Sequence, residues 1–263
     1  MAFYYPLCSS SNGNAGFLGD AQGGILLDAG LSLREFSTAL AFRDLSPAVI
    51  RGIFITHEHS DHIKGLRSIV SELHVPVYGS CETLEWLIEN KYIPAKSTLI
   101  EIKKKSVTLA DLTVRAFSTP HDSVHSLGYH VDFANGKSAC LCTDLGTVTD
   151  EVRENLTGCD FVFLESNYDE ELLWHGPYPP FLKRRIASDH GHLSNTDCAD
   201  MLLSLFGGGC THFLLGHLSE TNNRPELAYA CALERLSKTG ALIGEDYRLS
   251  VAKVRSTGDI ETI

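Results

Sequence analysis

The sequence lacks long apolar stretches and a recognisable export signal. No apolar run in its 263 residues approaches the ~18–20 residues that a membrane-spanning helix requires, so we expect no membrane partner. The first six residues, MAFYYP, have neither the basic start nor the apolar core of a signal peptide. These absences lead us to expect a cytoplasmic protein.

Cysteines are present, but they lack the spacing of a metal-binding ribbon or a redox motif. None of the eight cysteines belongs to a C-x-x-C pair, which excludes a zinc ribbon and a thioredoxin-type motif. Scattered thiols in a cytoplasmic chain are expected to be reduced. Most of these cysteines should therefore be small buried apolar side chains.

Positive charge is scarce as well. The 22 lysines and arginines are outnumbered by 33 aspartates and glutamates, which gives a net charge of −11. An acidic surface repels nucleic acid and anionic lipid at long range, so a bound polyanion must meet a local basic patch or a metal site. A mix of 43% hydrophobic and 21% charged residues is ordinary for a globular protein and excludes a disordered, collagen-like or coiled-coil chain.

Hydrophobic patterning predicts short strands separated by helices. Strands are expected at residues 3–8, 16–18, 24–27, 49–56, 107–110, 112–117, 127–133, 138–142, 161–164 and 212–216. Helices are expected near 31–42, 80–91, 196–205 and 225–240, with a polar loop at 9–14 and a hairpin turn at Asn135-Gly136. We therefore expect two sheets with helices outside them, a four-layer αββα sandwich, in one domain spanning residues 1–263.

The densest polar motif, THEHSDH at residues 56–62, ends the predicted strand 49–56 and continues beyond it. It holds four potential metal ligands, His57, His59, Asp61 and His62. Burying so many polar groups without partners costs several kcal/mol, so a metal centre explains them better than a packed core. The plain alternative is a solvated polar turn.

The pattern His57-x-His59-x-Asp61-His62 resembles the signature of the metallo-β-lactamase superfamily. The resemblance implies further ligands in three later motifs, STPHD, LCTDLG and LLGHLS, at His121, Asp144 and His217. His125 competes with His121 for its role, Asp144 is alternatively a helix cap, and His217 is alternatively a buried neutral histidine.

In this family's arrangement, two metal ions share the ligands. The resemblance implies that His57, His59 and His121 hold one ion, that Asp61, His62 and His217 hold the second, and that Asp144 bridges them. Nitrogen and oxygen ligands without a thiolate suit Zn²⁺, Mn²⁺ or Fe.

Further segments narrow the resemblance to the YycJ/WalJ-like branch of the superfamily. They are residues 9–14, 26–30, 56–65, 189–195 and 217–223. The resemblance implies a metal-dependent phosphodiesterase, a 5′→3′ DNA exonuclease, in which a hydroxide bridging two metals attacks phosphorus. Tyr168 stands where many relatives have histidine, so we assign it no ligand role.

Catalysis also needs a group that protonates the leaving oxygen. His192 is our candidate for this acid, with substrate positioning or a structural hydrogen bond as alternatives, while Asp144 would act at the metals. His190 is a weaker candidate because it occupies an unspecified position of its motif. Asp28 is expected to support a ligand histidine or the loop rather than to bind metal.

Substrate binding is expected at two places near residue 190. Ser194 and Asn195 begin a predicted helix, whose N–H groups would meet a phosphate, although ordinary N-capping explains them equally. Lys183, Arg184 and Arg185 form a basic cluster that would contact a DNA backbone. This cluster and Lys103-Lys104-Lys105 are alternatively solvated surface charges.

The competing function is a small-molecule hydrolase, namely a cyclic phosphodiesterase, lactonase or thioesterase. Only the 46 residues 218–263 follow His217, little room for the helical C-terminal domain of glyoxalase II-like thioesterases. The 73 positions from Asp144 to His217 are too few for the inserted domain of β-CASP RNA-processing relatives. A third alternative is a metal-binding interaction protein without hydrolase activity.

Overall fold

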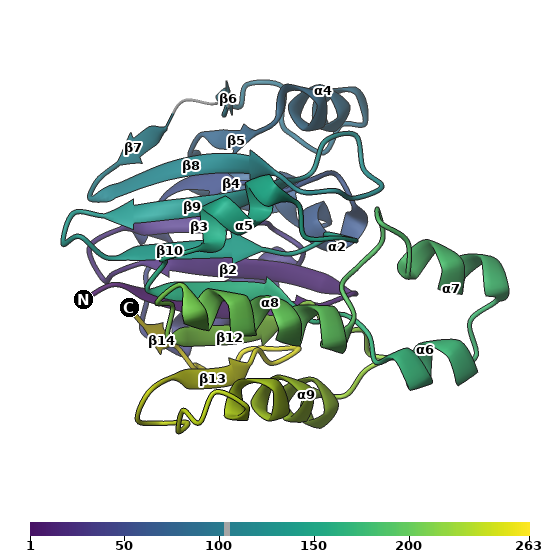
Figure 1. Ribbon diagram of the computed structural model, residues 1–263. Coiled ribbons are helices and arrows are strands. Elements are labelled where there is room, and N and C mark those ends of the chain that lie inside the picture. Colours follow the sequence, from purple (N-terminus) through teal and green to yellow (C-terminus); the bar gives the residue numbers. More distant parts are fainter. Residues whose placement is uncertain (103–105) are drawn as a thin grey trace.

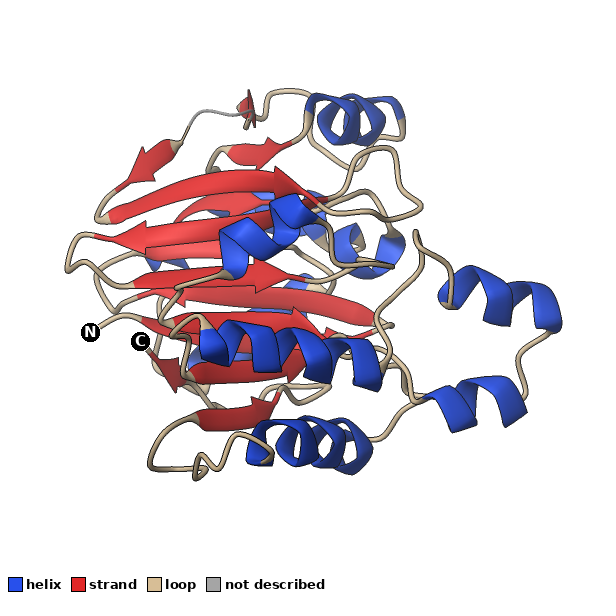
Figure 2. Cartoon of the chain, in the orientation of Figure 1, coloured by secondary structure: helices blue, strands red, loops and turns tan. Residues whose placement is uncertain are grey.

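Two β-sheets face each other and carry helices on their outer surfaces in the computed structural model (Figures 1 and 2). The structure describes residues 1–102 and 106–263, and the predicted charge run Lys103-Lys104-Lys105 lies outside the described residues. Within the described ranges, each sheet has seven strands. The two chain ends lie together at one edge of the sandwich (Figure 1).

The first sheet combines an antiparallel half with a parallel half. In spatial order it contains β14 (Glu261–Thr262), β1 (Phe3–Ser10), β2 (Gly13–Gly19), β3 (Gly24–Leu27), β4 (Ile50–Phe54), β5 (Val77–Gly79) and β6 (Leu99–Glu101). Pairing is antiparallel from β14 to β3 and parallel from β3 to β6. The outer face packs on α1 (Leu33–Ala41), α2 (Ser60–Ile63), α3 (Leu66–Leu73) and α4 (Cys81–Glu89).

The second sheet is also mixed. Its spatial order is β13 (Arg248–Val251), β12 (His212–Gly216), β11 (Phe161–Glu165), β10 (Ser138–Cys142), β9 (Leu127–Phe133), β8 (Leu112–Ser118) and β7 (Val107–Leu109). Strands β7 to β10 form the predicted antiparallel meander, and β10 to β13 are parallel. Helices α5 (Asp150–Leu156), α8 (Asn195–Gly207) and α9 (Pro225–Ser237) cover its outer face.

The central core lies between the two inner sheet faces. Tyr129 is fully buried there, its ring centroid lies 5.5 Å from that of Phe54, and its hydroxyl donates to the Ile55 carbonyl. Separate apolar layers fill the spaces between each sheet and its helices, with Phe36 buried on one side and Leu202 on the other. The predicted αββα sandwich is confirmed.

The predicted polar loop at residues 9–14 is wrong. Strand β1 continues to Ser10 and β2 begins at Gly13, so only a two-residue turn separates them. Ser9 and Asn14 are buried at the strand ends, where Ser9 Oγ accepts a hydrogen bond from the His217 N–H. Their polarity, which we interpreted as a loop signal, instead serves buried groups that line the site.

Several helix and strand limits also differ from the prediction. The predicted helix 31–42 begins at Leu33, because Ser32 caps it in a reciprocal capping box with Glu35. We did not predict the helices or strands at α2, α3, α5, β5, β6, β13 and β14, nor α6 (Glu170–His175), α7 (Pro180–Ile186) and the 3-10 turn Pro47–Val49. Most of these elements have seven residues or fewer, too short for a clear hydrophobic period.

The carboxyl ends of the parallel strands β4, β10, β11 and β12 open toward the same edge of the sandwich, where the site lies (Figure 1). Beyond this edge, α6 and α7 project away from the sheets (Figure 1). Among the described residues, we find no helix with the length and apolarity needed to cross a bilayer.

We predict that Gly30→Ala destabilises the fold. A Cβ at Gly30 would lie 1.6 Å from the Asp61 carbonyl oxygen and 2.6 Å from the Asn14 nitrogen, so the backbone must shift, at a cost of about 1–3 kcal/mol. Thermal unfolding would measure this loss. Gly207→Ala is the matched control, because its Cβ meets nothing within 4 Å; it should leave the midpoint unchanged or raise it. Equal midpoints for both variants would contradict the prediction.

Candidate metal centre

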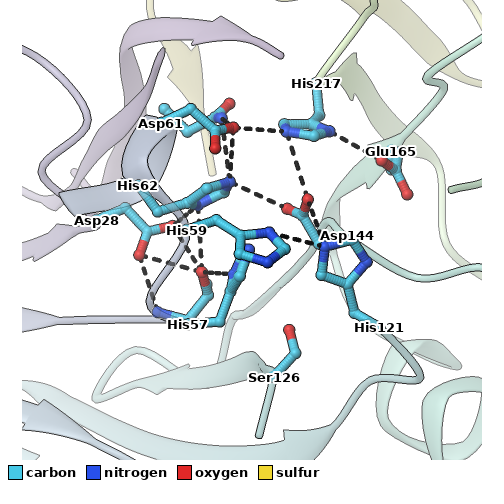
Figure 3. A network of polar contacts seen from close by, with 12 residues as sticks. Asp28, His57, His59, Asp61, His62, His121, Ser126, Asp144, Glu165 and His217 are labelled. Atoms are coloured by element: carbon cyan, nitrogen blue, oxygen red, sulfur yellow. Dashed lines mark hydrogen bonds and ion pairs between the residues drawn. The ribbon is translucent and has the colours of Figure 1, made fainter. Parts of the chain in front are cut away.

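The first group of ligands comes from the segment that follows β4. The His57 ring is fully buried, and His59 occupies the N-cap position of α2 without making a side-chain cap. The ring of His59 is therefore available to the cluster, and its Nδ1 lies 3.2 Å from Nε2 of His121. Figure 3 shows these three rings converging, and their ligand atoms lie within 4.8 Å of one another.

The second group joins the start of α2 to the end of β12. The Asp61 carboxylate places Oδ2 3.2 Å from Nε2 of His62 and 3.4 Å from Nε2 of His217. Asn14 donates to the same Asp61 oxygen over 3.1 Å. These contacts bring residues that are 155 positions apart in the sequence, His62 and His217, onto one carboxylate.

Asp144 lies between the two groups. One of its oxygens is 3.3 Å from Nε2 of His62, and the other is 3.6 Å from Nε2 of His121 and 3.4 Å from Nε2 of His217. The residue has a φ of 59°, and His217 has 55°. Such left-handed conformations are strained for residues other than glycine, so the turns after β10 and β12 are held in place to aim these side chains inward.

Two buried ligand atoms test whether cations fit here. Nε2 of His57 is buried without a hydrogen-bond partner, and buried Oδ2 of Asp144 has no hydrogen bond and only the 3.3 Å ionic contact with Nε2 of His62. Leaving such atoms unpaired is costly, and a cation would satisfy them. The cluster offers imidazole nitrogens and carboxylate oxygens without a thiolate, so these residues fit divalent metal ions such as zinc, manganese or iron.

Electrostatics differ across the cluster. Burial opposes charge on His217, but the surrounding carboxylates outweigh burial and raise the pKa of His217 to about 10. Burial and the neighbouring histidines together lower the pKa of His57 well below its usual value. One end of the cluster therefore has excess negative charge and the other has neutral imidazoles, and both are suitable surroundings for a cation.

The ligand histidines are oriented by hydrogen bonds to their other ring nitrogen. Nδ1 of His62 lies 2.8 Å from Oδ2 of Asp28, and Nδ1 of His121 lies 2.9 Å from the Gly191 carbonyl. Asp28 also accepts hydrogen bonds from the backbone and hydroxyl of Thr56. Asp28 thus contacts a candidate ligand histidine, as the sequence led us to expect, and such contacts fix the ring and its tautomer.

Sequence reasoning missed Glu165. Its carboxylate is fully buried, and Oε1 lies 2.6 Å from Nδ1 of His192 and 2.8 Å from Nδ1 of His217. Burial opposes its ionisation, yet the two histidines prevail and hold the pKa of Glu165 below its usual value. A signal existed, because this carboxylate directly follows the predicted strand 161–164 between the strands that lead to Asp144 and His217.

The other histidines are placed differently. The side chain of His192 is 19% exposed beside the cluster, with its ring centroid 5.0 Å from that of His121. His125 contacts Ser118 and Glu82 instead, and His190 is exposed. Tyr168, to which we assigned no ligand role, is buried, and its carbonyl accepts from the Asn195 N–H.

Ser194 and Asn195 lie at the start of α8 as predicted, but both are buried. Ser194 caps the helix by accepting from the Asp197 N–H, and the Asn195 N–H donates to the Tyr168 carbonyl. The Asn195 amide exchanges hydrogen bonds with Asn223. These internal partners favour ordinary capping over phosphate binding at Ser194 and Asn195.

The predicted basic cluster forms the last turn of α7. Arg185 is ion-paired with Asp122, the residue after the ligand His121, and Lys183 donates to the Trp174 carbonyl over 2.7 Å. Arg184 has no side-chain partner among the described residues. The structure therefore brings the cluster beside the metal centre, with one cation neutralised by Asp122.

A cluster of potential metal ligands at the strand ends of an αββα sandwich is typical of a class of metal-dependent hydrolases. Comparison with known proteins indicates the same class. A family model described as a beta-lactamase superfamily domain matches residues 24–210. Exodeoxyribonuclease WalJ of Streptococcus pneumoniae is 33% identical over 250 residues, covering 94% of this chain and 92% of the relative. Exodeoxyribonuclease YycJ of Bacillus anthracis is 36% identical over 246 residues, covering 92% of each chain.

A solved structure shows the same fold. The metallo-β-lactamase fold protein YhfI from Bacillus subtilis matches with a TM-score of 0.71 and 14% identity, over 97% of this chain and 98% of that protein. This chain belongs to the metallo-β-lactamase superfamily, within its YycJ/WalJ-like branch.

We predict that Asp144→Asn abolishes binding of manganese at both positions, because a neutral amide cannot balance two adjacent cations. Titration of the metal-free protein with Mn²⁺, which favours oxygen and nitrogen over thiolate ligands, should approach two equivalents for the native chain. Asp111→Asn is the control, since Asp111 is exposed in the turn before β8, at the opposite end of that strand from His121. Saturation of the native chain at one equivalent would refute the dinuclear arrangement.

Proposed function

We propose that this protein is a metal-dependent DNA exonuclease that degrades its substrate in the 5′→3′ direction. The observation that carries the proposal is the 33–36% identity, over at least 92% of the chain, to two proteins named as exodeoxyribonucleases. The buried His/Asp cluster supports it, because two-metal sites are common among enzymes that cleave phosphodiesters. The small-molecule alternative has no specific observation in its favour.

We further propose that two divalent cations are bound, one by His57, His59 and His121 and the other by Asp61, His62 and His217, with Asp144 shared. Bound there, the cations would supply the positive charge that lowers the pKa of the attacking water and neutralises phosphate oxygens. The protein's own contribution is to hold these ligands rigidly, through Asp28 at His62 and Glu165 at His217.

We propose His192 as the general acid. Glu165 accepts a hydrogen bond from Nδ1 of His192, which leaves Nε2 as the nitrogen that can deliver a proton to the leaving oxygen. The partial exposure of the His192 side chain supports this role, because a substrate must reach it. Geometry within reach of the substrate is the first requirement for an acid catalyst.

We assign DNA binding to the projecting segment α6–α7. Trp174 is 50% exposed and Phe181 is 68% exposed, and such aromatic faces stack on the bases of single strands. Arg184 and Lys183 would meet phosphates, while Arg185 fastens α7 to Asp122 beside the metals. A local cationic and aromatic surface is what a chain with a net charge of −11 needs to attract DNA.

We also propose that residues 1–263 act as one domain in the cytoplasm. Strand β14 pairs with β1, which supports a single folding unit. The eight cysteines are free, in keeping with a reducing compartment.

The decisive experiment compares linear DNA labelled at the 5′ end with DNA labelled at the 3′ end. With Mn²⁺ or Zn²⁺ restored, the protein should release label from the 5′ end first, and the chelated protein should be inactive. Thioesters, lactones and cyclic nucleotides serve as competing substrates. Faster hydrolysis of one of these, with DNA left intact, would replace the nuclease proposal by the small-molecule alternative.

We predict that His192→Ala slows DNA hydrolysis by about 10²–10⁴-fold, the usual contribution of a general acid, without loss of Mn²⁺ binding. The loss should shrink for p-nitrophenyl phosphodiesters, whose leaving group needs no proton. His190→Ala is the control, since His190 is exposed in the same segment. An equal loss on both substrates would favour positioning over acid catalysis.

We predict that the double variant Lys183→Ala and Arg184→Ala weakens DNA binding and flattens its salt dependence. Removing a cation that neutralises one phosphate reduces the log–log slope by about 0.7 on single strands, so a change of about 1.4 is expected if both cations contribute. Arg34 and Arg43, exposed on the opposite layer, provide the matched control as a double alanine variant. Hydrolysis of bis-p-nitrophenyl phosphate should not change, and an unaltered slope would show that these are solvated charges.

A further inference from the structure

A second cluster of potential metal ligands lies on the outer face of the second sheet. It contains His130 in β9, Cys140 in β10 and Cys159 just before β11. The antiparallel register pairs His130 directly with Cys140, so their side chains share one face of the sheet. Cys140 and Cys159 are at most 1% exposed and His130 is 8% exposed. None of these residues belongs to the centre around Asp144.

The distances within the cluster match those of metal ligands. The three ligand atoms lie within 4.8 Å of one another, and Sγ of Cys159 is 3.6 Å from Nδ1 of His130. A tetrahedral zinc ion, with bonds of about 2.3 Å to sulfur and 2.0 Å to nitrogen, separates such ligands by about 3.5 Å. The protein thus holds the sulfur and nitrogen at the spacing that zinc requires.

The far side of the His130 ring has the partner that a ligand histidine usually has. Nε2 lies 3.2 Å from Oδ1 of Asp132, and Arg115 lies 3.3 Å from the other carboxylate oxygen. Metal-binding histidines commonly donate this second N–H to a carboxylate, which fixes the ring and strengthens the ligand. A histidine that is only packed in a strand does not require a hydrogen-bonded carboxylate with its own arginine partner.

The near side of the ring is also polar. The Asn155 carbonyl, near the end of α5, lies 2.8 Å from Nδ1 of His130 and 3.4 Å from Sγ of Cys159. Carbonyls in the last turn of a helix lack intrahelical partners; this one accepts hydrogen bonds from the His130 ring and from Cys159, so it becomes a further ligand only when an ion displaces those protons. The hydrogen bond from Cys140 and the nearby imidazole outweigh burial and lower the pKa of Cys159 to about 6, whereas burial raises the pKa of Cys140 well above its usual value, so the Cys140 proton leaves only when an ion binds.

We propose that His130, Cys140 and Cys159 form a structural site for a thiophilic divalent cation, with zinc as its natural occupant. Two thiolates and an imidazole are the soft ligand set that selects zinc over manganese or magnesium. On binding, the ion replaces the protons on Nδ1 and on the thiols, which leave to solvent. It would join α5 to β9, β10 and the start of β11. This site does not depend on the proposed nuclease function.

Cobalt is the probe that separates this site from the centre around Asp144. Co²⁺ bound to thiolate gives a sulfur-to-metal charge-transfer absorption, whereas Co²⁺ bound only to imidazole and carboxylate does not. The reduced native protein titrated with Co²⁺ should show this absorption, and added Zn²⁺ should abolish it. Cys159→Ser and Cys140→Ser should each lose the absorption while still binding two equivalents of Mn²⁺, which reports an intact fold and an intact His/Asp centre.

Cys231→Ser is the matched control, because Cys231 is a partly exposed cysteine in α9 outside the cluster, and it should keep the full absorption. Absence of the absorption in the native protein would overturn the proposal. So would its persistence in both Cys159→Ser and Cys140→Ser, which would assign it to another thiol. A mass spectrum showing Cys140 and Cys159 joined as a disulfide in freshly purified protein would equally reject the metal site.

Discussion

The buried charge around Asp144 is the constraint on which the rest of the structure depends. The carboxylates of Asp61, Asp144 and Glu165 converge with several imidazoles within a few ångströms, and ligand atoms on His57 and Asp144 have no hydrogen-bond partner. Such an arrangement is costly in a folded chain, and it persists only because two packed sheets hold the strand ends from which these residues leave. The left-handed backbone conformations of Asp144 and His217 add local strain to this cost of burial.

Glu165 connects the residues around Asp144 to His192, the proposed general acid. One oxygen contacts both His217 and His192, while the other accepts from the backbone N–H groups of Leu145 and Leu193. A single buried carboxylate thus positions a ligand, the proposed acid and two loops at once. Substitution of Glu165 would disturb the metals and the acid together, so the roles of the two histidines are better separated at His192 itself.

The seven candidate ligands are recognisable from their motifs because metal chemistry dictates both their residue types and their position after strands, and the structure brings these seven side chains together. The loop prediction fails at Ser9 and Asn14. Polar residues usually indicate an exposed loop, but these two side chains are buried at strand ends, where they contact polar groups of the site. Glu165 was missed because its partners, His192 and His217, are distant in sequence, and its place directly after the predicted strand 161–164 was the one local signal for it. For Ser194 and Asn195, the predicted helix start is correct, but polar groups at this start already form hydrogen bonds within the fold.

The position of the basic cluster reconciles the acidic composition with a polyanionic substrate. Arg185 is held by Asp122, which follows the ligand His121, so α7 is anchored to the metal-binding loop rather than free to swing away. Its neighbours Lys183 and Arg184 lie in the same helix as the exposed Phe181, and Lys183 contacts the carbonyl of the exposed Trp174. Attraction confined to this edge would bring a DNA strand to the metals while the rest of the surface, with its excess of carboxylates, repels it. Under the proposed function, repulsion from the acidic surface would leave the α6–α7 segment as the favoured approach for a polyanion.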